Sequence, residues 1–397
     1  MSTRRRLTAG FATLAVSAAL TGAGAAGASS AGAGPAHLAD EQGCVQQVLS
    51  GMSTAQRVGQ LFLVGVSSTD PTSAQLNMIT DDHLGGVYLA GNSSAGVSAT
   101  KRVTDELRAR ATSTNGTGLW VGTDQEGGQV QRLTGPGFSA MPTALEQGQV
   151  DPDVLRSNAE TWGGQLKDAG VNLNLAPVFG TVPEDVGTGN QPIGRYDREY
   201  GYTPDTVGSH GGAVVKGEQA AGVQTTAKHF PGLGRADGNT DTTAGVKDTV
   251  TTRDDPYVQP FQTAVTDGAT LVMVSSAIYT KIDPGHIATF SPTVLRGMLR
   301  DDLGFDGVII TDSMAAAAVA SVPVGDRALN FLDAGGTVIL TGEGSDVPAM
   351  IDAVTTEAGS DSAFAAKVNA AAEHVLRAKN AAGLLTCDGT DHAVRSR

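Results

Sequence analysis

The sequence predicts an α/β fold of one domain, a (β/α)8 barrel of the TIM type, and three observations support this prediction. Eight apolar, β-branched runs recur along the chain, and most are followed by a loop rich in Gly and Asp and then by a helical pattern. The runs are apolar throughout, which is typical of parallel strands buried on both faces. Polar side chains gather where the runs end, and this is the rim at which such barrels carry their active sites.

The expected strands and helices alternate, which indicates right-handed βαβ units. The strands are expected at residues 60–66, 85–91, 118–124, 171–178, 222–230, 270–277, 307–312 and 336–342. The helices between them are expected at residues 100–111, 153–168, 205–219, 260–267, 292–302 and 328–334, with a last helix at 362–380. Neither an internal repeat nor a linker to a second domain interrupts this pattern.

The N-terminus is typical of a secretory signal peptide, expected to span residues 1–28. Three arginines at 4–6 precede an uncharged stretch rich in Ala and Leu at 7–20, and Ala26-Gly27-Ala28 forms a small-x-small cleavage site. A membrane anchor is the alternative, but the stretch is short for a span. We therefore expect a secreted, extracellular bacterial protein with no stable membrane span.

We expect residues 29–43, which are rich in Ala, Gly and Ser, to form a flexible linker. The barrel domain is then expected at 44–387, followed by a short tail at 388–397. Cys44 and Cys387 are the two cysteines of the chain and lie near the two ends of this domain. In an exported protein they are expected to form a disulfide, although two free thiols are the alternative.

Composition and motifs exclude several classes of function. The formal net charge of −14 argues against a nucleic-acid partner. The glycines of residues 232–238 do not have dinucleotide-loop spacing. The seven histidines form no His-x-x-x-His pair, so we expect neither a metal nor any other cofactor. The oligomeric state is not predicted.

Three motifs follow the third, fifth and seventh strands: "TDQEGGQVQRL" (123–133), "KHFPGLG" (228–234) and "LRDDLGFDGVIITDSM" (299–314). Together they resemble the barrel domain of family 3 glycoside hydrolases, most of all the single-domain bacterial β-N-acetylglucosaminidases (β-N-acetylhexosaminidases). The resemblance covers residues 45–385. It implies an O-glycosyl hydrolase that cleaves terminal β-N-acetylglucosamine or a related β-sugar with retention.

The resemblance also implies roles for particular residues. Retaining hydrolysis needs a carboxylate nucleophile and a proton donor, and Asp312 matches the nucleophile; without the resemblance, Asp312 could equally be a helix N-cap. The positions that match sugar-binding residues of the family are Asp124, Arg132, Arg198, Lys228 and His229.

The proton donor departs from the family pattern. In the subfamily it is a histidine two residues after an aspartate, in the loop that follows the Lys-His pair. Here the corresponding text is Asp241-Thr242-Thr243, so a threonine replaces the histidine. Asp241 is our first candidate for the acid, with Asp237 as an alternative if burial raises its pKa. His286, from the loop after the sixth strand, is another.

A second departure is Gly180, where many relatives carry an aspartate. These departures leave two alternatives to a full hydrolase. The protein could be a catalytically impaired sugar-binding protein on the same fold. It could also be a glycoside phosphorylase, in which phosphate replaces water as the acceptor. The substrate is expected to come from cell-wall or chitin-type fragments.

Overall fold

The structure is a computed structural model, and it describes residues 35–111, 116–342 and 344–387. The expected signal peptide, residues 29–34 of the expected linker and the tail at 388–397 lie outside the described residues. Residues 35–43, which we expected in the linker, belong instead to helix α1 (Pro35–Gly51). This segment contains Ala, Leu, Glu and Gln, which favour helix. The barrel lies in a compact unit that begins at Asp40.

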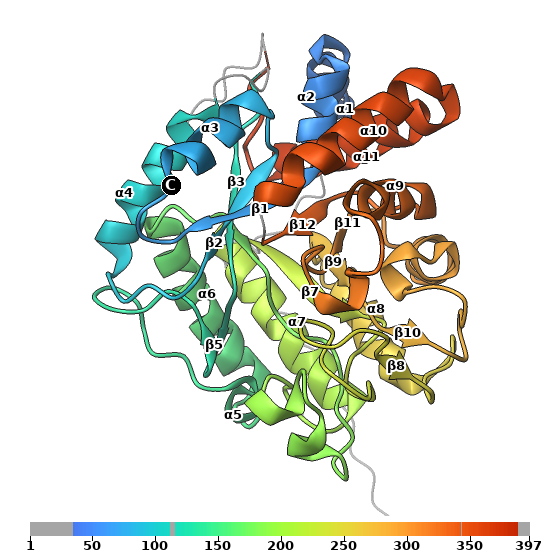
Figure 1. Cartoon of the computed structure of the whole chain (residues 1–397). Coiled ribbons are helices and arrows are strands. Elements are labelled where there is room, and N and C mark those ends of the chain that lie inside the picture. Colours follow the sequence, from blue (N-terminus) through green and yellow to red (C-terminus); the bar gives the residue numbers. More distant parts are fainter. Residues whose placement is uncertain (1–34, 112–115, 343, 388–397) are drawn as a thin grey trace, which may run out of the picture. The chain divides into compact units, whose positions relative to one another are not determined.

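Eight parallel strands form the central sheet (Figure 1), in the order β11-β9-β7-β6-β3-β2-β1-β12. A parallel bridge between Ile310 and Val338 joins the two outer strands and closes the sheet into a barrel. All eight expected strands are present, with shorter bounds. They are β1 (Phe62–Ser67), β2 (Gly86–Ala90), β3 (Trp120–Thr123), β6 (Leu173–Asn174), β7 (Gln224–Phe230), β9 (Leu271–Val274), β11 (Val308–Thr311) and β12 (Ile339–Thr341).

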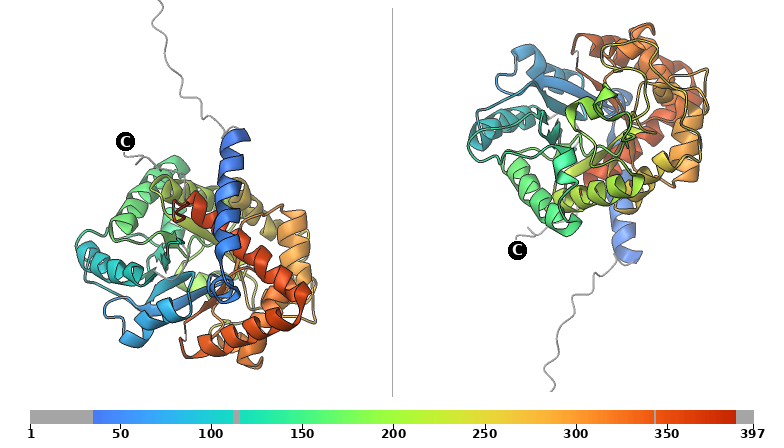
Figure 2. Two further views of the ribbon diagram at one scale, coloured as in Figure 1. Left: turned by 90° about the horizontal axis from the view of Figure 1, so that it is seen from above. Right: turned by 90° about the horizontal axis from the view of Figure 1, so that it is seen from below.

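Helices surround these strands in the views from above and below (Figure 2). Sequence signals set several of their starts: Thr72 and Gln75 form a reciprocal capping box at α3, and Asp151 caps α6 before a proline. The helices after α1 are α2 (Thr54–Gly59), α3 (Ser73–Asp81), α4 (Val97–Ala109), α5 (Ala144–Gln147), α6 (Pro152–Asp168), α7 (Pro204–Ala220), α8 (Gln259–Thr266), α9 (Val324–Ala334), α10 (Val347–Ser360) and α11 (Ser362–Ala381).

The expected helix at 292–302 is present as a π-helix, η6 (Thr293–Asp302). Short 3-10 helices lie between the main elements: η2 (Gly187–Gly189), η3 (Gly194–Tyr196), η4 (Pro256–Val258), η5 (Ala288–Phe290), η7 (Ala317–Val319) and η8 (Gly344–Asp346). Helices α2, α3, α5 and α10 were not expected.

Two small strand pairs arise from the segments that follow the barrel strands. β4 (Gln125–Gly127) pairs antiparallel with β5 (Val130–Gln131), directly after β3. β8 (Lys247–Asp248) pairs parallel with β10 (Ile278–Tyr279), and so joins the segments that follow β7 and β9. Both pairs shape the carboxyl-terminal rim of the barrel.

Every residue of β3, β7, β9 and β11 is buried, and the residues of β9 and most of those of β11 are apolar, whereas β7 also carries buried polar side chains. Burial of whole strands is typical of a parallel sheet that is covered on both faces. In the part of the chain that the structure describes, no helix is long and apolar enough to cross a membrane.

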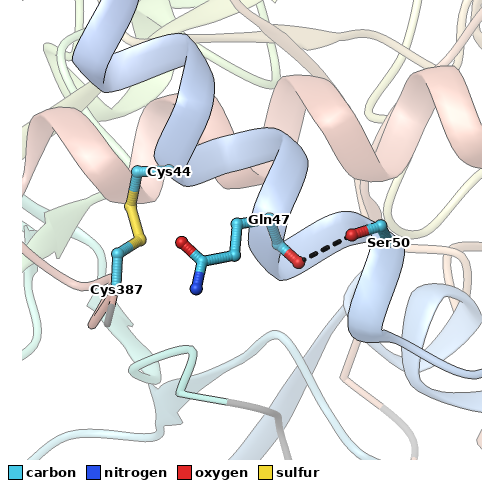
Figure 3. The surroundings of a disulfide bond; sticks show 4 residues. All are labelled: Cys44, Gln47, Ser50 and Cys387. Carbon is cyan, nitrogen blue, oxygen red and sulfur yellow. Dashed lines mark hydrogen bonds between the residues drawn. A yellow bond between two sulfur atoms is a disulfide. The ribbon is translucent and has the colours of Figure 1, made fainter. Parts of the chain in front are cut away.

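The expected disulfide is confirmed (Figure 3). Cys44 of α1 and Cys387 are bonded, with their Cα atoms 5.7 Å apart, although 343 positions separate them in sequence. Both half-cystines are buried in a small apolar cluster that also contains Val45, Leu376 and Leu385. The bond therefore ties helix α1, near the start of the compact unit, to the segment that follows its last helix, α11 (Ser362–Ala381).

Candidate active site

A cavity of about 440 Å³ opens at the carboxyl-terminal ends of the barrel strands. This is the rim at which barrel enzymes carry catalytic groups. Of the site residues predicted from sequence, the cavity lining contains Asp124, Arg132, Arg198, Lys228, His229, Asp241 and Asp312. The structure thus brings together side chains from five separate segments.

Lys228 lies at the centre of a buried ion network. Its Nζ atom is 2.7 Å from Asp124 Oδ1 and 2.7 Å from Glu126 Oε1. Arg198 donates to the same glutamate through two nitrogens, with Nε 2.8 Å from Oε2 and Nη2 2.7 Å from Oε1. A third Arg198 nitrogen, Nη1, donates to the Pro192 carbonyl at 2.8 Å. Both cations are therefore fixed in position at the cavity wall.

The charges in this network support one another. Burial alone would lower the pKa of the Lys228 ammonium. The negative charges of Asp124 and Glu126 have the larger combined effect and raise that pKa. Burial likewise opposes ionisation of Glu126, yet Arg198 and Lys228 hold the pKa of its carboxyl well below the usual range. Lys228 and Glu126 are therefore both charged at neutral pH, and the network presents fixed hydrogen-bonding groups to a polar ligand.

Sequence reasoning missed Glu126. It lies in the same "DQEGG" text as Asp124, two residues further on, and both side chains reach the same lysine. The spacing of two residues, which places side chains on the same face of an extended chain, was the available signal. Only the folded chain reveals its partner Arg198, which is 72 positions away.

His229 is buried beside these cations, and its Nδ1 atom has no hydrogen-bond partner among the described residues. Burial, followed by the charges of Arg198 and Lys228, lowers the pKa of the imidazole well below its usual value. A histidine in this environment is neutral, so it is available to bind a hydroxyl and is not suited to proton donation.

Asp312 follows β11 and lines the cavity. Its main-chain N–H donates to the Val274 carbonyl at 3.1 Å, and its Oδ1 accepts from Ser313 N at 2.8 Å. The N-cap alternative is wrong, because the next helical turn, η7, starts after Ala316. Asp312 is thus free for a role in the cavity.

Burial raises the pKa of Asp312 to about 7, and the nearby charge of Asp241 adds to this effect. The Ser313 N–H, Lys228 and Arg198 act in the opposite direction. Two carboxyl groups that face one cavity repel each other when both are ionised, so one of them readily holds a proton. This arrangement is common in sites of acid–base catalysis.

The loop after β7 brings Asp241 to the cavity. The main-chain N–H groups of Ala317 and Ala318 donate to the carbonyls of Asp241 and Thr240, at 3.1 and 3.0 Å. The loop is therefore docked on the segment that follows Asp312. Thr243 is exposed and does not line the cavity, so it does not replace the missing histidine.

The other two candidates for the acid do not reach the site. Asp237 is exposed, and its Oδ1 accepts from Lys247 N at 2.7 Å. His286 pairs with Asp283 at 2.9 Å and lines a different cavity, because its loop lies against the segment around α9. The expectation that His286 enters the site is wrong. Gly180 does not line the cavity either; an added Cβ there would lie 3.5 Å from Leu233 N.

Arg132 lies at the edge of the site and is partly exposed. Its Nη1 donates to Asn92 Oδ1 at 3.1 Å. The remaining polar lining that sequence reasoning did not single out includes Tyr88, Gln129, Tyr196, Asn239 and Ser313. These residues provide further polar groups that a bound ligand could contact.

A buried carboxyl group supports the network from behind. Asn174 accepts from Gln125 N at 3.0 Å and donates to Gln125 O at 3.1 Å, and it also donates to Glu218 Oε1 at 2.8 Å. Gln125 lies between Asp124 and Glu126, so Asn174 fixes the backbone of both. Burial raises the pKa of Glu218 to about 8, so this carboxyl is neutral at pH 7.

Within the described ranges, no group of three or more His, Cys, Asp and Glu side chains is arranged to hold a metal ion. The site instead consists of two carboxyl groups and a set of fixed cations and amides. Such a set can bind several hydroxyl groups and place a carboxylate beside a reacting carbon.

Comparisons with known proteins identify relatives of the whole barrel. Residues 53–378 match the sequence model described as "Glycosyl hydrolase family 3 N terminal domain". A "Beta-hexosaminidase" of Xylella fastidiosa (strain M23) is 32% identical over 327 residues, covering 80% of this chain and 92% of the relative.

Two solved structures have the same fold. A β-N-acetylhexosaminidase from Beutenbergia cavernae superposes with a TM-score of 0.81 at 48% identity, covering 83% of this chain and 99% of that one. A family 3 β-N-acetylglucosaminidase from Paenibacillus sp. superposes with a TM-score of 0.77 at 28% identity, covering 87% of this chain and 66% of that one.

Proposed function

The chain belongs to glycoside hydrolase family 3 and is a glycosyl hydrolase; from that premise we propose that it is an exported, retaining β-N-acetylhexosaminidase that forms a covalent intermediate on Asp312. The observation that carries the proposal is that Asp312 and Asp241 line the same cavity as the Lys228 network. Terminal β-N-acetylglucosamine is the proposed sugar, in keeping with the names of the relatives, and cell-wall or chitin-type fragments are its proposed source.

Sugar binding is assigned to the fixed groups of the cavity wall. Asp124 accepts from sugar hydroxyls, while Lys228, Arg198 and Arg132 donate to them, and neutral His229 can do either. Glu126 does not need to touch the sugar, since it holds Arg198 and Lys228 by ion pairs. The sugar ring is thereby placed with its anomeric carbon over Asp312.

The first chemical step is displacement at that carbon. Asp312 attacks in its ionised form, the bond to the leaving oxygen breaks, and Asp241 gives its proton to that oxygen. In the second step Asp241, now ionised, takes a proton from water, and the hydroxide oxygen replaces Asp312 on the sugar. The free sugar leaves with the same anomeric configuration, and both carboxyl groups return to their starting state.

The proton must therefore reside on Asp241 when the sugar is bound, although burial gives Asp312 the raised pKa in the structure. A sugar in the cavity changes this balance in two ways. It removes water from Asp241, which is exposed, and so favours its neutral form. Secondly, the polarised anomeric carbon faces Asp312, and as its positive charge grows towards the transition state it stabilises the ionised form of Asp312.

The test compares two classes of β-N-acetylglucosaminide: a dinitrophenyl glycoside, whose leaving group needs no acid, and a natural disaccharide, which does. Turnover of both substrates, lost by about a thousandfold or more in Asp312→Ala, is expected. Asp241→Asn should lose the disaccharide activity by about 10²–10⁴-fold and keep most of the activity on the dinitrophenyl glycoside.

Other outcomes point to the alternatives. Sugar binding without turnover of either substrate would leave a sugar-binding protein and overturn the hydrolase mechanism. A requirement for phosphate would make the protein a phosphorylase. Equal loss of both substrates in Asp241→Asn would remove Asp241 from the role of acid.

Export is part of the proposal. The disulfide between Cys44 and Cys387 supports it, because such bonds persist in oxidising compartments outside the cytoplasm. Mass spectrometry of the protein from culture medium should find a chain that starts near residue 29. Recovery of the full-length chain from the cytoplasm alone would contradict export.

A further inference from the structure

A second cavity, of about 230 Å³, lies at the opposite end of the barrel strands. Gly336 and Thr337 in its lining come shortly before β12, whereas Asp312 follows the far end of the adjacent strand β11. The four residues of β11 span about 13 Å at 3.3 Å per residue. The cavity is therefore separate from the candidate active site.

The lining of this second cavity is basic, on a chain whose formal net charge is −14. Arg296 and Arg300 lie four residues apart on η6, and Lys367 and His374 come from α11. No acidic side chain is among the lining residues.

Small residues create the space between the basic side chains of η6 and those of α11. Ala370 and Ala371 lie between Lys367 and His374 on α11, and Gly335 and Gly336 directly follow α9. A Cβ atom added at Gly335 would lie 2.8 Å from Arg296 Cγ, so a larger residue there would displace the arginine.

Main-chain carbonyls hold both arginines in place. Arg300 Nη1 donates to the carbonyls of Phe305 and Gly307, at 2.6 and 2.7 Å. Arg296 Nη2 donates to the carbonyl of Asp333 at 2.5 Å. Among the described residues, no carboxylate lies within 4 Å of either guanidinium, whereas Arg235 and Arg253 pair with Asp255 and Asp302.

Two aspartates lie beside the cavity, but neither forms an ion pair with Arg296 or Arg300. Asp333 pairs with Lys367 at 2.7 Å, and its side chain is 56% exposed. Asp306 is 79% exposed and pairs with Arg377 at 3.4 Å, while its carbonyl accepts from His374 Nδ1 at 3.0 Å. Water screens charges at such exposure.

Burial lowers the pKa of Arg300 to about 10, and Asp306 only partly opposes this effect. The pKa of His374 is also lowered, by burial first and then by the charge of Arg300. An anion in the cavity would raise the pKa of both groups, because it stabilises their charged forms. The guanidiniums thus form a fixed positive site whose charge the described protein groups leave incompletely balanced.

We propose that this cavity binds a phosphate group, with Arg296, Arg300 and Lys367 as its principal donors. A guanidinium can donate two parallel hydrogen bonds to phosphate oxygens, and an ammonium adds a point charge. Phosphate has oxygens on all sides, which suits donors that come from two facing helices. The group can belong to free phosphate or to the phosphodiester of an anionic polymer, since the chemistry is shared.

The test is a calorimetric titration of the purified protein with inorganic phosphate, at constant ionic strength. Saturable binding to one site is expected. The double variant Arg296→Gln/Lys367→Gln should bind about tenfold more weakly or not at all, because charge-assisted hydrogen bonds are lost. Both positions are exposed enough to leave the fold intact, and unchanged turnover of the dinitrophenyl glycoside checks this.

Arg253→Gln is the matched control, since it removes an exposed arginine that already has a carboxylate partner. It should bind phosphate like the parent protein. A second titration with a glycerol phosphodiester oligomer distinguishes the sources: tighter binding of the oligomer assigns the site to a polymer, and binding of inorganic phosphate alone assigns it to the free ion. Absence of saturation with both ligands, or equal affinity in the double variant, would overturn the proposal.

Discussion

The carboxylate of Glu126 holds two buried cations at once: Arg198, through two nitrogens at 2.7 and 2.8 Å, and Lys228, at 2.7 Å. The side chain of Glu126 is only 3% exposed, so water does little to screen its charge or to stabilise the two cations in its place. Removal of one partner from a buried ion pair leaves the other charge uncompensated.

We expect Glu126→Gln to damage both stability and sugar binding. Two cations would share an uncharged amide, which is expected to cost about 3–5 kcal/mol of unfolding free energy. Arg198 and Lys228 would also lose their fixed positions, so kcat/KM should fall by about a hundredfold or more. Urea unfolding and steady-state kinetics measure the two effects.

Lys101→Gln is a suitable control, because it breaks an exposed ion pair with Asp105 far from the cavity. That change should cost under about 1 kcal/mol and leave the kinetics unchanged. Equal behaviour of the two variants would show that the network does not position the sugar-binding groups.

The pH dependence of Asp312 gives a second prediction. The charge of Asp241 helps to raise the pKa of Asp312 to about 7, and in the proposed mechanism Asp312 attacks only when it is ionised. In Asp241→Asn this repulsion is absent, so the pKa of Asp312 falls. The acidic limb of kcat/KM on the dinitrophenyl glycoside should then move to lower pH.

The measurement is a pH–rate profile of both proteins on that substrate, which does not need the acid. An unchanged acidic limb would show that the two carboxyl groups do not interact in the working enzyme. A move to higher pH would contradict the assigned direction.

Much of this fold could be predicted because its strands are buried on both faces. Such strands appear as continuous apolar runs, and all eight runs became barrel strands. The polar residues at their ends, Asp124, Lys228, His229 and Asp312, therefore fell at one rim and line one cavity. Helix α10 was missed, although an apolar stripe runs through Val347, Met350 and Val354.

The rest of the site depends on contacts that no local pattern shows. The sequence analysis did not single out Glu126, because its ion pairs join it to Arg198 and Lys228, which are distant in sequence. Glu218 lies in the expected helix at 205–219, and only the fold shows that Asn174 connects it to Gln125. His286 failed as an acid because Asp283 holds it outside the cavity.

The disulfide gives a prediction on stability. Reduction, or Cys44→Ser/Cys387→Ser, should lower the unfolding free energy by about 2–5 kcal/mol, because the bond restricts the unfolded chain across 343 positions. Thermal unfolding with and without reductant measures this. The catalytic cavity lies elsewhere, so activity below the transition should persist. Identical melting of both forms would contradict the prediction.

Glu218 gives the last prediction, with a sign that depends on pH. Its pKa is about 8 in the folded protein against an ordinary value of 4.5. Below pH 4.5 the carboxyl is protonated in the folded and unfolded chains alike. As the pH rises from 4.5 to 8, only the unfolded chain releases the proton, which favours unfolding, and stability is lost across this window.

Glu218→Gln removes that ionisation and keeps an oxygen that accepts from Asn174 Nδ2. The variant should therefore gain about 1–3 kcal/mol of unfolding free energy relative to the parent at pH 8, and little at pH 5. Urea unfolding at the two pH values measures the difference. Glu218→Ala, which also loses the hydrogen bond and leaves a void, should be less stable than Glu218→Gln at both. A gain that is independent of pH would contradict the raised pKa. It would show that Glu218 is ionised in the folded protein and that Asn174 donates to a charged carboxylate.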